Sequence, residues 1–256
     1  MKEKSVILAV ETSSRIGSVA IALNGKMLGE TVFSAPLRHS VEIFPAIREL
    51  LDQFNLKPGQ IEHIYISVGP GSFTGLRIAT TLAKIMQLAH AAKIVTVDTL
   101  DVVAANVINL IPENTLSVSN HKLPAMSDER VAAVLDAKRG QFFIAVYERD
   151  QDDERKAAGR AIWKKVLPDC LMTISQFLDR FDCEAKPIWL LGDGLLYYKD
   201  KFQADSVHFF DEKYWSPRAG KVHLLGRQMA LKEQFADALT LTPNYLRTPD
   251  VTVKPR

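Results

Sequence analysis

The most informative stretch of this sequence is Gly69-Pro70-Gly71-Ser72-Phe73-Thr74-Gly75-Leu76-Arg77. It follows the β-branched and aromatic run 64–66, which is typical of a buried strand, and Gly69-Pro70-Gly71 ends that strand. Ser72 is a suitable N-cap for a helix over 74–92, a segment that contains no proline. The stretch therefore predicts a strand, a glycine-rich turn and the N-terminus of a helix.

The predicted helix over 74–92 is apolar almost all the way round. One face carries Leu76, Ala79, Ala83, Met86 and His90, and another carries Ile78, Leu82, Ile85, Ala89 and Ala92. Such a helix should be buried on more than one side. Its own sheet can cover one side, and either a second protein chain or the rest of the same domain can cover the other.

The glycine turn allows two interpretations. Backbone N–H groups at a helix N-terminus can hold a phosphate or a carboxylate, and Arg77 lies nearby as a charge partner. Alternatively, the glycines only allow the chain to turn sharply, and Ser72 only caps the helix. The turn has neither the Gly-Lys-Ser/Thr of a P-loop nor the spacing GxGxxG. The spacing therefore favours the structural interpretation.

The composition indicates a globular chain of 256 residues, 47% of them hydrophobic, with a net charge of +2. This charge is far from that of a protein that binds nucleic acid unaided, and no basic stripe with interleaved aromatic residues is visible. The two cysteines, Cys170 and Cys183, match neither a disulfide framework nor a paired-cysteine metal site. The apolar run 6–10 is too short for a signal peptide, so we expect a cytoplasmic protein without a membrane span.

The order of the predicted elements indicates a duplicated α/β lobe. The first copy has antiparallel strands at 6–10, 18–23 and 27–33, a helix from residue 40 with Pro45 near its start, a strand near 64, the helix over 74–92, a strand at 94–97 and a helix over 99–106. The second copy has strands at 131–135, 142–147 and 162–167, a helix over 175–181, a strand at 188–191, a helix over 195–202, a strand at 207–210 and a long helix opened by Ser216-Pro217.

These elements divide the chain into three parts. We expect an N-terminal lobe over 1–110, a linker or exposed loop over 111–129, and a C-terminal lobe over 130–256 whose last helix can pack back on the first lobe. The polar stretch 111–129 lacks periodicity, and 151–160 reads as a charged surface loop.

The nonamer 69–77 resembles the signature of the TsaB (YeaZ) family, a subunit of the bacterial machinery that makes threonylcarbamoyl adenosine in tRNA. Other family-like features follow in order: Glu11-Thr12-Ser13, His39-Ser40, Asp136-Ala137-Lys138-Arg139-Gly140 with Tyr147, Gly192-Asp193-Gly194, and Pro243-Asn244-Tyr245-Leu246-Arg247. The resemblance spans nearly the whole chain. Two departures stand out, because many relatives carry aspartate in place of Glu11 and arginine in place of Lys138.

The resemblance implies the α/β fold of actin, Hsp70 and sugar kinases, built from two RNase H-like lobes. It also implies a non-catalytic scaffold or activator subunit that binds the catalytic subunit TsaD, alongside the ATPase TsaE, and that reaches tRNA only indirectly through this complex. TsaB proteins commonly self-associate through the same surface, so we expect a homodimer when the chain is alone. No cofactor and no metal are expected.

The resemblance also assigns roles to particular residues. TsaD would dock on the helix over 74–92 and on the helix that starts near residue 40. The expected interface residues are Val41, Phe44, Arg77, Thr80, Leu82, Ala83, Met86, Gln87 and His90. A possible vestigial nucleotide site consists of Glu11, Ser72, Asp136 and Asp193. We expect none of these residues to be catalytic.

Three alternatives compete with this hypothesis. The chain is not expected to be TsaD itself, because no two histidines have the His-x-x-x-His spacing of the TsaD metal site. An actin-like enzyme that hydrolyses ATP or transfers phosphate would use Glu11, Asp136 and Asp193 as its carboxylates. A protease triad of Ser72, His39 and Asp98 has the right residue types, but serine is ordinary at a helix cap and no G-x-S-x-G elbow is present.

Overall fold

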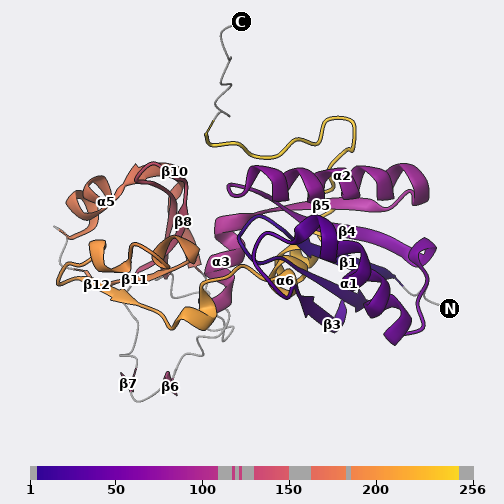
Figure 1. Cartoon of the computed structure of the whole chain (residues 1–256), viewed down its shortest axis with the longest axis horizontal. Helices are drawn as coiled ribbons and strands as arrows, with labels where there is room; N and C mark the ends of the chain where they lie inside the picture. The colour runs from indigo at the N-terminus through magenta and orange to yellow at the C-terminus, as the bar shows by residue number, and fades with distance from the viewer. Residues whose placement is uncertain are drawn as a thin grey trace, which may run out of the picture.

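The protein consists of two lobes, each built on a five-stranded sheet (Figure 1). The structure is a computed structural model, which describes residues 5–108, 117–118, 121–122, 130–149, 163–182 and 186–247. The N-terminal sheet has the strand order β3-β2-β1-β4-β5. Its strands are β1 (Val6–Glu11), β2 (Ser18–Leu23), β3 (Lys26–Val32), β4 (Ile61–Gly69) and β5 (Lys93–Asp98). β1, β2 and β3 pair antiparallel, and β4 and β5 continue the sheet in parallel from β1.

The C-terminal sheet repeats this topology with the order β10-β9-β8-β11-β12. Its strands are β8 (Arg130–Asp136), β9 (Gln141–Arg149), β10 (Trp163–Thr173), β11 (Ile188–Leu191) and β12 (Val207–Phe209). The first three strands are again antiparallel, and the last two again parallel. The duplicated α/β fold with two RNase H-like lobes is therefore confirmed.

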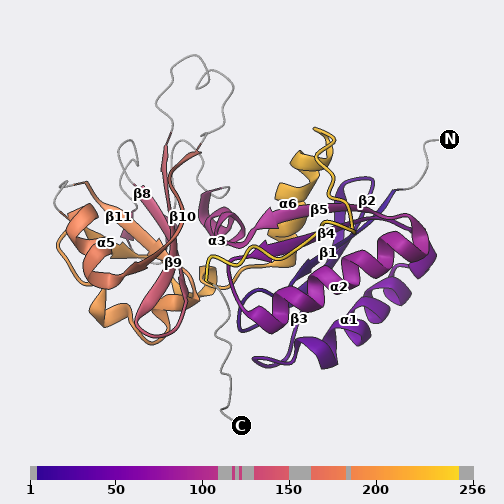
Figure 2. The ribbon, with the colours of Figure 1, turned by 90° about the horizontal axis from the view of Figure 1, so that it is seen from above.

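Helices α1 (His39–Gln53) and α2 (Phe73–His90) lie next to each other on one face of the N-terminal sheet (Figure 2). Both fill the core below them with aliphatic side chains such as Ile43 and Ala79, which are fully buried. α1 runs without a break through Pro45. α2 begins as predicted, because the Ser72 hydroxyl accepts a hydrogen bond from the backbone N–H of Gly75.

Each lobe is completed by one helix from the other half of the sequence. Helix α6 (Ala219–Ala230) covers the second face of the N-terminal sheet, where Val222 packs in one cluster with Ile7 and Tyr65. Helix α3 (Thr99–Ile108) follows β5 but buries Leu100 and other apolar residues in the core of the C-terminal lobe. The division at residue 110 thus describes the sheets but not the packing of these two helices.

Two predicted helices differ from the structure. The last helix begins at Ala219 instead of Ser216-Pro217, because Asn106 Nδ2 donates to the carbonyls of Tyr214 and Ser216 and holds this segment outside the helix. The segment 195–202 contains only short 3₁₀ turns, η3 (Asp193–Leu195) and η4 (Lys199–Lys201), in place of one helix. Helix α5 (Ile174–Phe181), by contrast, starts as predicted with a capping box between Thr173 and Gln176.

Parts of the predicted loops lie outside the described residues. This holds for 151–160 and for most of 111–129, within which only the two-stranded pair β6 (Ser117–Val118) and β7 (His121–Lys122) is described. Short elements η1 (Pro58–Gln60) and η5 (Glu212–Tyr214) complete the structure.

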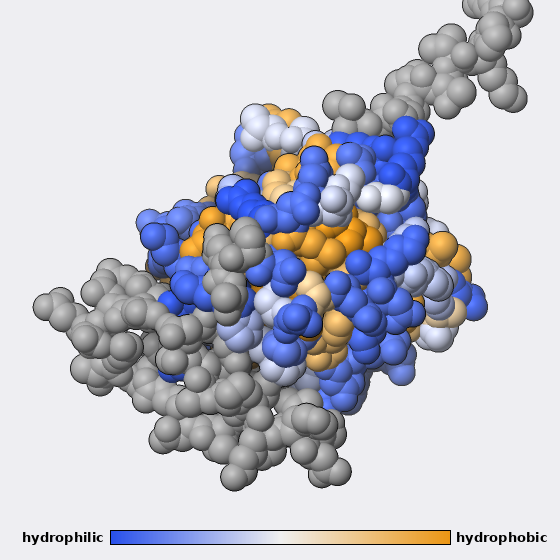
Figure 3. Space-filling model, turned by 90° about the vertical axis from the view of Figure 1, so that its left-hand side faces the viewer, coloured by the Kyte–Doolittle hydropathy of each residue, from blue (hydrophilic) through white to orange (hydrophobic). Residues whose placement is uncertain are grey.

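Hydrophobic residues are also present on the surface of the C-terminal lobe. Figure 3 looks at this end of the molecule and shows a band of hydrophobic residues surrounded by hydrophilic ones.

None of the helices in the described part of the chain has the length and hydropathy needed to span a bilayer.

Candidate functional site

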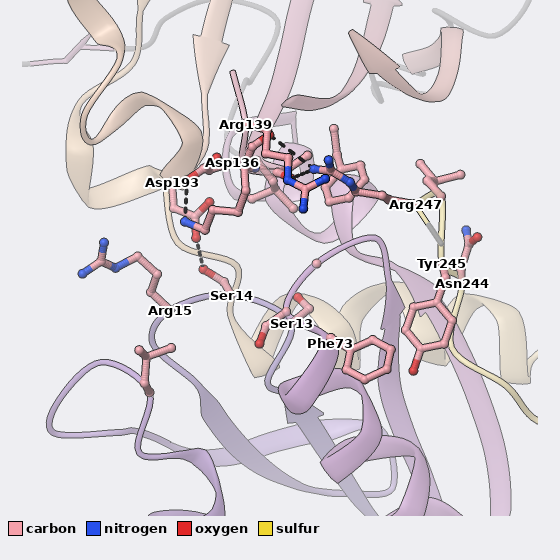
Figure 4. Close-up of a pocket in the computed structure, with 18 of the residues that line it drawn as sticks. Ser13, Ser14, Arg15, Phe73, Asp136, Arg139, Asp193, Asn244, Tyr245 and Arg247 are labelled. Carbon is pink, nitrogen blue, oxygen red and sulfur yellow. Dashed lines mark hydrogen bonds and ion pairs between the residues drawn. The ribbon is translucent and has the colours of Figure 1, made fainter. Parts of the chain in front are cut away.

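A cavity of about 660 Å³ lies between the two lobes (Figure 4). Its walls come from the β1–β2 loop, the N-terminus of α2, the β8–β9 hairpin, the turn after β11 and the C-terminal segment. The lining residues are Ser13, Ser14, Arg15, Leu37, Gly71, Ser72, Phe73, Leu135, Asp136, Ala137, Lys138, Arg139, Phe143, Asp193, Tyr197, Asn244, Tyr245, Leu246 and Arg247. Segments from all parts of the sequence thus converge on one site.

The β1–β2 loop connects the two lobes across this cavity. Ser14 donates its hydroxyl proton to Asp193 Oδ2 at 2.5 Å, and Arg15 Nη1 donates to the Tyr197 hydroxyl at 2.6 Å. Burial raises the pKa of Asp193, although the hydrogen bond from Ser14 opposes this shift. The carboxyl of Asp193 is therefore part of a contact between the lobes.

Glu11, which was expected in a possible vestigial nucleotide site, does not line the cavity. Its side chain is fully buried and accepts hydrogen bonds from the Ser13 N–H at 2.6 Å and from the hydroxyls of Ser13 and Ser67. Burial raises the pKa of this carboxyl, and the hydrogen bonds oppose the shift. Glu11 therefore holds the start of the β1–β2 loop against β4. The other three predicted residues of that site, Ser72, Asp136 and Asp193, do line the cavity.

The glycine turn before α2 serves close packing. A Cβ atom at Gly75 would lie 1.7 Å from the Thr12 carbonyl oxygen, and one at Gly71 would lie 2.3 Å from that of Ser13. The Ser72 N–H donates to the Ser13 carbonyl at 2.6 Å, and Thr12 Oγ1 donates to the Gly75 carbonyl at 2.7 Å. This arrangement agrees with the structural interpretation of the turn, because the Ser72 N–H and hydroxyl already have partners.

The three residue types of a protease triad have other partners in the structure. The Ser72 hydroxyl caps α2, and His39 Nε2 contacts the Ser14 carbonyl at 2.9 Å. Burial lowers the pKa of His39. Asp98 lies 3.9 Å from the Lys165 ammonium, on the contact between β5 and the C-terminal lobe. These contacts assign structural roles to all three residues.

Four cationic side chains line the cavity. Lys138 and Arg139 lie at the tip of the β8–β9 hairpin, and the Lys138 ammonium pairs with Asp136 Oδ2 at 2.6 Å. Arg247 donates from Nη1 to the Ala137 carbonyl at 2.6 Å, and Arg15 belongs to the opposite lobe. Arg15 and Tyr197 were not predicted as site residues, because nothing in their local sequence marks them and only the fold brings them together.

The C-terminal segment after α6 crosses the N-terminal lobe and reaches the cavity. Ala236 forms an isolated bridge with Ile94, and the Asn244 N–H donates to the Val68 carbonyl at 2.7 Å. Tyr245 then places its ring 5.0 Å from that of Phe73 at the start of α2. This segment therefore links β5, β4 and α2 before Arg247 contacts the second lobe.

The expected interface residues of α1 and α2 fall into two groups. Thr80, Leu82, Ala83 and Met86 are buried in the N-terminal lobe, where they contribute to its own core, and their role at an interface stays a prediction. Val41, Phe44, Arg77 and His90 are exposed, and Gln87 is half-buried and accepts the Ala238 N–H through Oε1. The large apolar residues that α2 exposes are Ile85 and Leu88. Together with Val41 and Phe44 of α1, they form an exposed apolar surface, which is called the docking surface below because docking was expected on these two helices.

Within the described residues, no three His, Cys, Asp or Glu side chains are grouped closely enough to hold a metal ion. The expectation that the chain binds neither a metal nor a cofactor stays a prediction.

Comparison with known proteins gives consistent matches. The family model described as TsaD, tRNA N6-adenosine threonylcarbamoyltransferase, matches residues 34–167. The tRNA threonylcarbamoyladenosine biosynthesis protein TsaB of Bacillus subtilis is 25% identical over 251 residues, which cover 97% of this chain and 96% of that protein. The protein of the same name from Haemophilus influenzae is 23% identical over 97% of this chain and 95% of its own length. The chain belongs to the TsaD-like family and, within it, to TsaB (YeaZ).

The solved structures support the fold. YeaZ from Pseudomonas aeruginosa has a TM-score of 0.73 with 22% identity, and the match covers 94% of this chain and all of that structure. This likeness shows the same fold, and the TsaB relatives described above confirm the family resemblance found in the nonamer 69–77.

Proposed function

We propose that the chain takes part in tRNA threonylcarbamoyladenosine biosynthesis as a non-catalytic subunit that binds TsaD, with TsaE as a further member of the complex. The two TsaB relatives described above are named for this pathway, and each matches this chain over nearly its whole length. The observation that carries the proposal of a subunit is the docking surface: two adjacent helices of one lobe each expose two large apolar side chains.

Helix α2 carries separate apolar residues for the core of the lobe and for its surface. Leu82 and Met86 fill the core of the lobe, so Ile85 and Leu88 are additional to the residues that the lobe needs for its own packing. Burying one leucine side chain contributes about 1.5–3 kcal/mol, so a few such residues supply much of the free energy of an interface. The same surface would join two copies of the chain in the absence of TsaD.

The test is a substitution at Leu88 with a matched control at Leu231. Leu88 is 76% exposed on α2, and Leu231 is 75% exposed just after α6, on the other face of the N-terminal sheet. We expect Leu88→Asp to weaken TsaD binding by about tenfold or more, because a carboxylate replaces a side chain that the interface would bury. Leu231→Asp should leave the affinity unchanged. Calorimetric titration of each purified variant with TsaD measures this difference.

Equal affinities of the two variants would refute the docking surface. Thermal melts provide the control for folding, and both variants should melt like the parent chain because both side chains are exposed. Sedimentation of the chain alone tests self-association, which Leu88→Asp should reduce and Leu231→Asp should not.

A second candidate function follows from the cavity between the lobes. Asp136 and Asp193 line it together with four cationic side chains, so an ATP-hydrolysing enzyme of the actin type stays an alternative. Magnesium-dependent ATP turnover by the pure chain that disappears in Asp136→Asn would favour this alternative over a non-catalytic subunit.

A further inference from the structure

The cavity between the lobes concentrates positive charge. Arg15, Lys138, Arg139 and Arg247 line it together with only two acidic residues, Asp136 and Asp193. This excess of two positive charges equals the net charge of +2 of the whole chain. The cavity therefore attracts anions more strongly than an average part of the surface.

Aromatic rings accompany these cations at both ends of the cavity. The guanidinium of Arg77 lies 3.8 Å from the centre of the Phe73 ring, and Tyr245 adds its ring to the same stack. In Figure 4, Arg15 lies at the opposite end from Phe73 and Tyr245. There the Arg15 guanidinium lies 5.2 Å from the centre of the Tyr197 ring, which is 68% exposed. Flat surfaces of aromatic rings and guanidinium groups stack on unpaired nucleobases.

The dimensions of the cavity restrict the form of the nucleic acid. A volume of about 660 Å³ is in the range of small-molecule pockets, so it accommodates a few unpaired nucleotides and not a duplex. Cations from three separate segments can contact the phosphates, and the two aromatic stacks can hold bases. None of this is visible in the sequence, because Arg15, Arg139 and Arg247 are more than a hundred residues apart along the chain.

We propose that this cavity binds unpaired nucleotides of an RNA hairpin loop, with Arg139 and Arg247 at the phosphates and Tyr197 and Tyr245 at the bases. The inference rests on the proposed function and deepens it, because it gives this subunit a direct contact with the tRNA substrate. It departs from the expectation that the chain reaches tRNA only through its partner.

Fluorescence anisotropy of the purified full-length chain with a labelled RNA stem-loop tests the proposal. The chain should bind the stem-loop, and a blunt duplex of the same stem should bind more weakly. Tyr197→Ala should weaken binding of the stem-loop by roughly five- to a hundredfold through loss of base stacking. Arg139→Ala should reduce the slope of log affinity against log salt concentration by about one, because one phosphate contact is lost.

Two matched controls lie outside both the cavity and the docking surface. Phe235 is an exposed aromatic residue and Arg48 an exposed arginine, so Phe235→Ala and Arg48→Ala should leave RNA binding unchanged. Equal binding of the stem-loop and the duplex, or equal effects of Tyr197→Ala and Phe235→Ala, would overturn the proposal. Binding of free ATP that is lost in Tyr197→Ala, without any binding of the stem-loop, would also overturn it, in favour of a pocket for a free nucleotide.

Measurement of TsaD binding separates this inference from the proposed function. Tyr197→Ala should bind TsaD normally, and Leu88→Asp should bind the stem-loop normally. If RNA binding fails while Leu88→Asp still weakens TsaD binding, only the RNA site is wrong. If RNA binding is found while TsaD binding is insensitive to Leu88→Asp, only the docking surface is wrong.

Discussion

Replacement of Gly75 by alanine should destabilise the chain, although the same change stabilises most helices. In a helix interior, alanine is favoured over glycine by about 1 kcal/mol. Here the new Cβ would lie 1.7 Å from the Thr12 carbonyl oxygen, so α2 and the β1–β2 loop must move apart. This movement weakens the hydrogen bonds from Thr12 Oγ1 to the Gly75 carbonyl and from the Ser72 N–H to the Ser13 carbonyl.

The magnitude follows from these contacts. Each hydrogen bond contributes about 1 kcal/mol, and overpacking a tight contact costs about 1–3 kcal/mol. After the gain in helix propensity, the free energy of unfolding should fall by about 2–4 kcal/mol. For a chain of this size such a loss lowers the melting temperature by about 5–15 °C.

Thermal unfolding followed by circular dichroism measures this change. Gly59→Ala is the matched control, because no atom lies within 4 Å of a Cβ at Gly59 and the residue is exposed. We expect its melting temperature to equal that of the parent chain. If Gly75→Ala melts together with Gly59→Ala, the close contact between α2 and the β1–β2 loop does not exist as described.

Two further predictions concern carboxyl groups whose pKa the fold raises, the half-buried Asp98 and the fully buried Glu11. Burial, with a contribution from the charge of Asp169, raises the pKa of Asp98 from 3.8 to about 6. The folded chain thus holds this proton more tightly than the unfolded chain, so the contribution of Asp98 to stability declines as the pH rises from 3.8 to about 6. Asp98→Asn should flatten the pH dependence of the melting temperature in this range, and an unchanged profile would contradict the assignment. Glu11→Ala should lower the free energy of unfolding by about 2–4 kcal/mol, because it leaves a cavity and removes the acceptor for the Ser13 N–H and the Ser67 hydroxyl. A urea midpoint equal to that of the parent chain would show that Glu11 has no such role.

Most of the fold was predictable because each element has a strong local signal. The strand, turn and helix around Ser72 depend on residues that are close in sequence, and the duplicated order of elements follows from such signals. The predicted start of the last helix was wrong because Asn106, more than a hundred residues away, donates a hydrogen bond to the Ser216 carbonyl. Local capping residues cannot reveal a partner at this distance.

The sites were less predictable, for two reasons. Periodicity showed that α2 has two apolar faces, but it could not show which residues the lobe needs for its own core. The resemblance placed Leu82 at the interface, and no local signal indicated that the lobe buries it. Glu11 was assigned to a possible vestigial nucleotide site by the family resemblance, and only the hydroxyls of Ser13 and Ser67 reveal its structural role. The cavity cations belong to separate elements, so charge along the sequence gives no sign of their convergence.

The packing of α6 has a consequence for how the protein forms during synthesis. The sheet of the N-terminal lobe is complete once β5 has been made, yet the face around Tyr65 stays bare until residues 219–230 have left the ribosome. During synthesis, this apolar face of the sheet therefore stays exposed for a long interval, and chaperones can bind the nascent chain there. A truncated product lacking α6 would retain this surface permanently and be prone to aggregation.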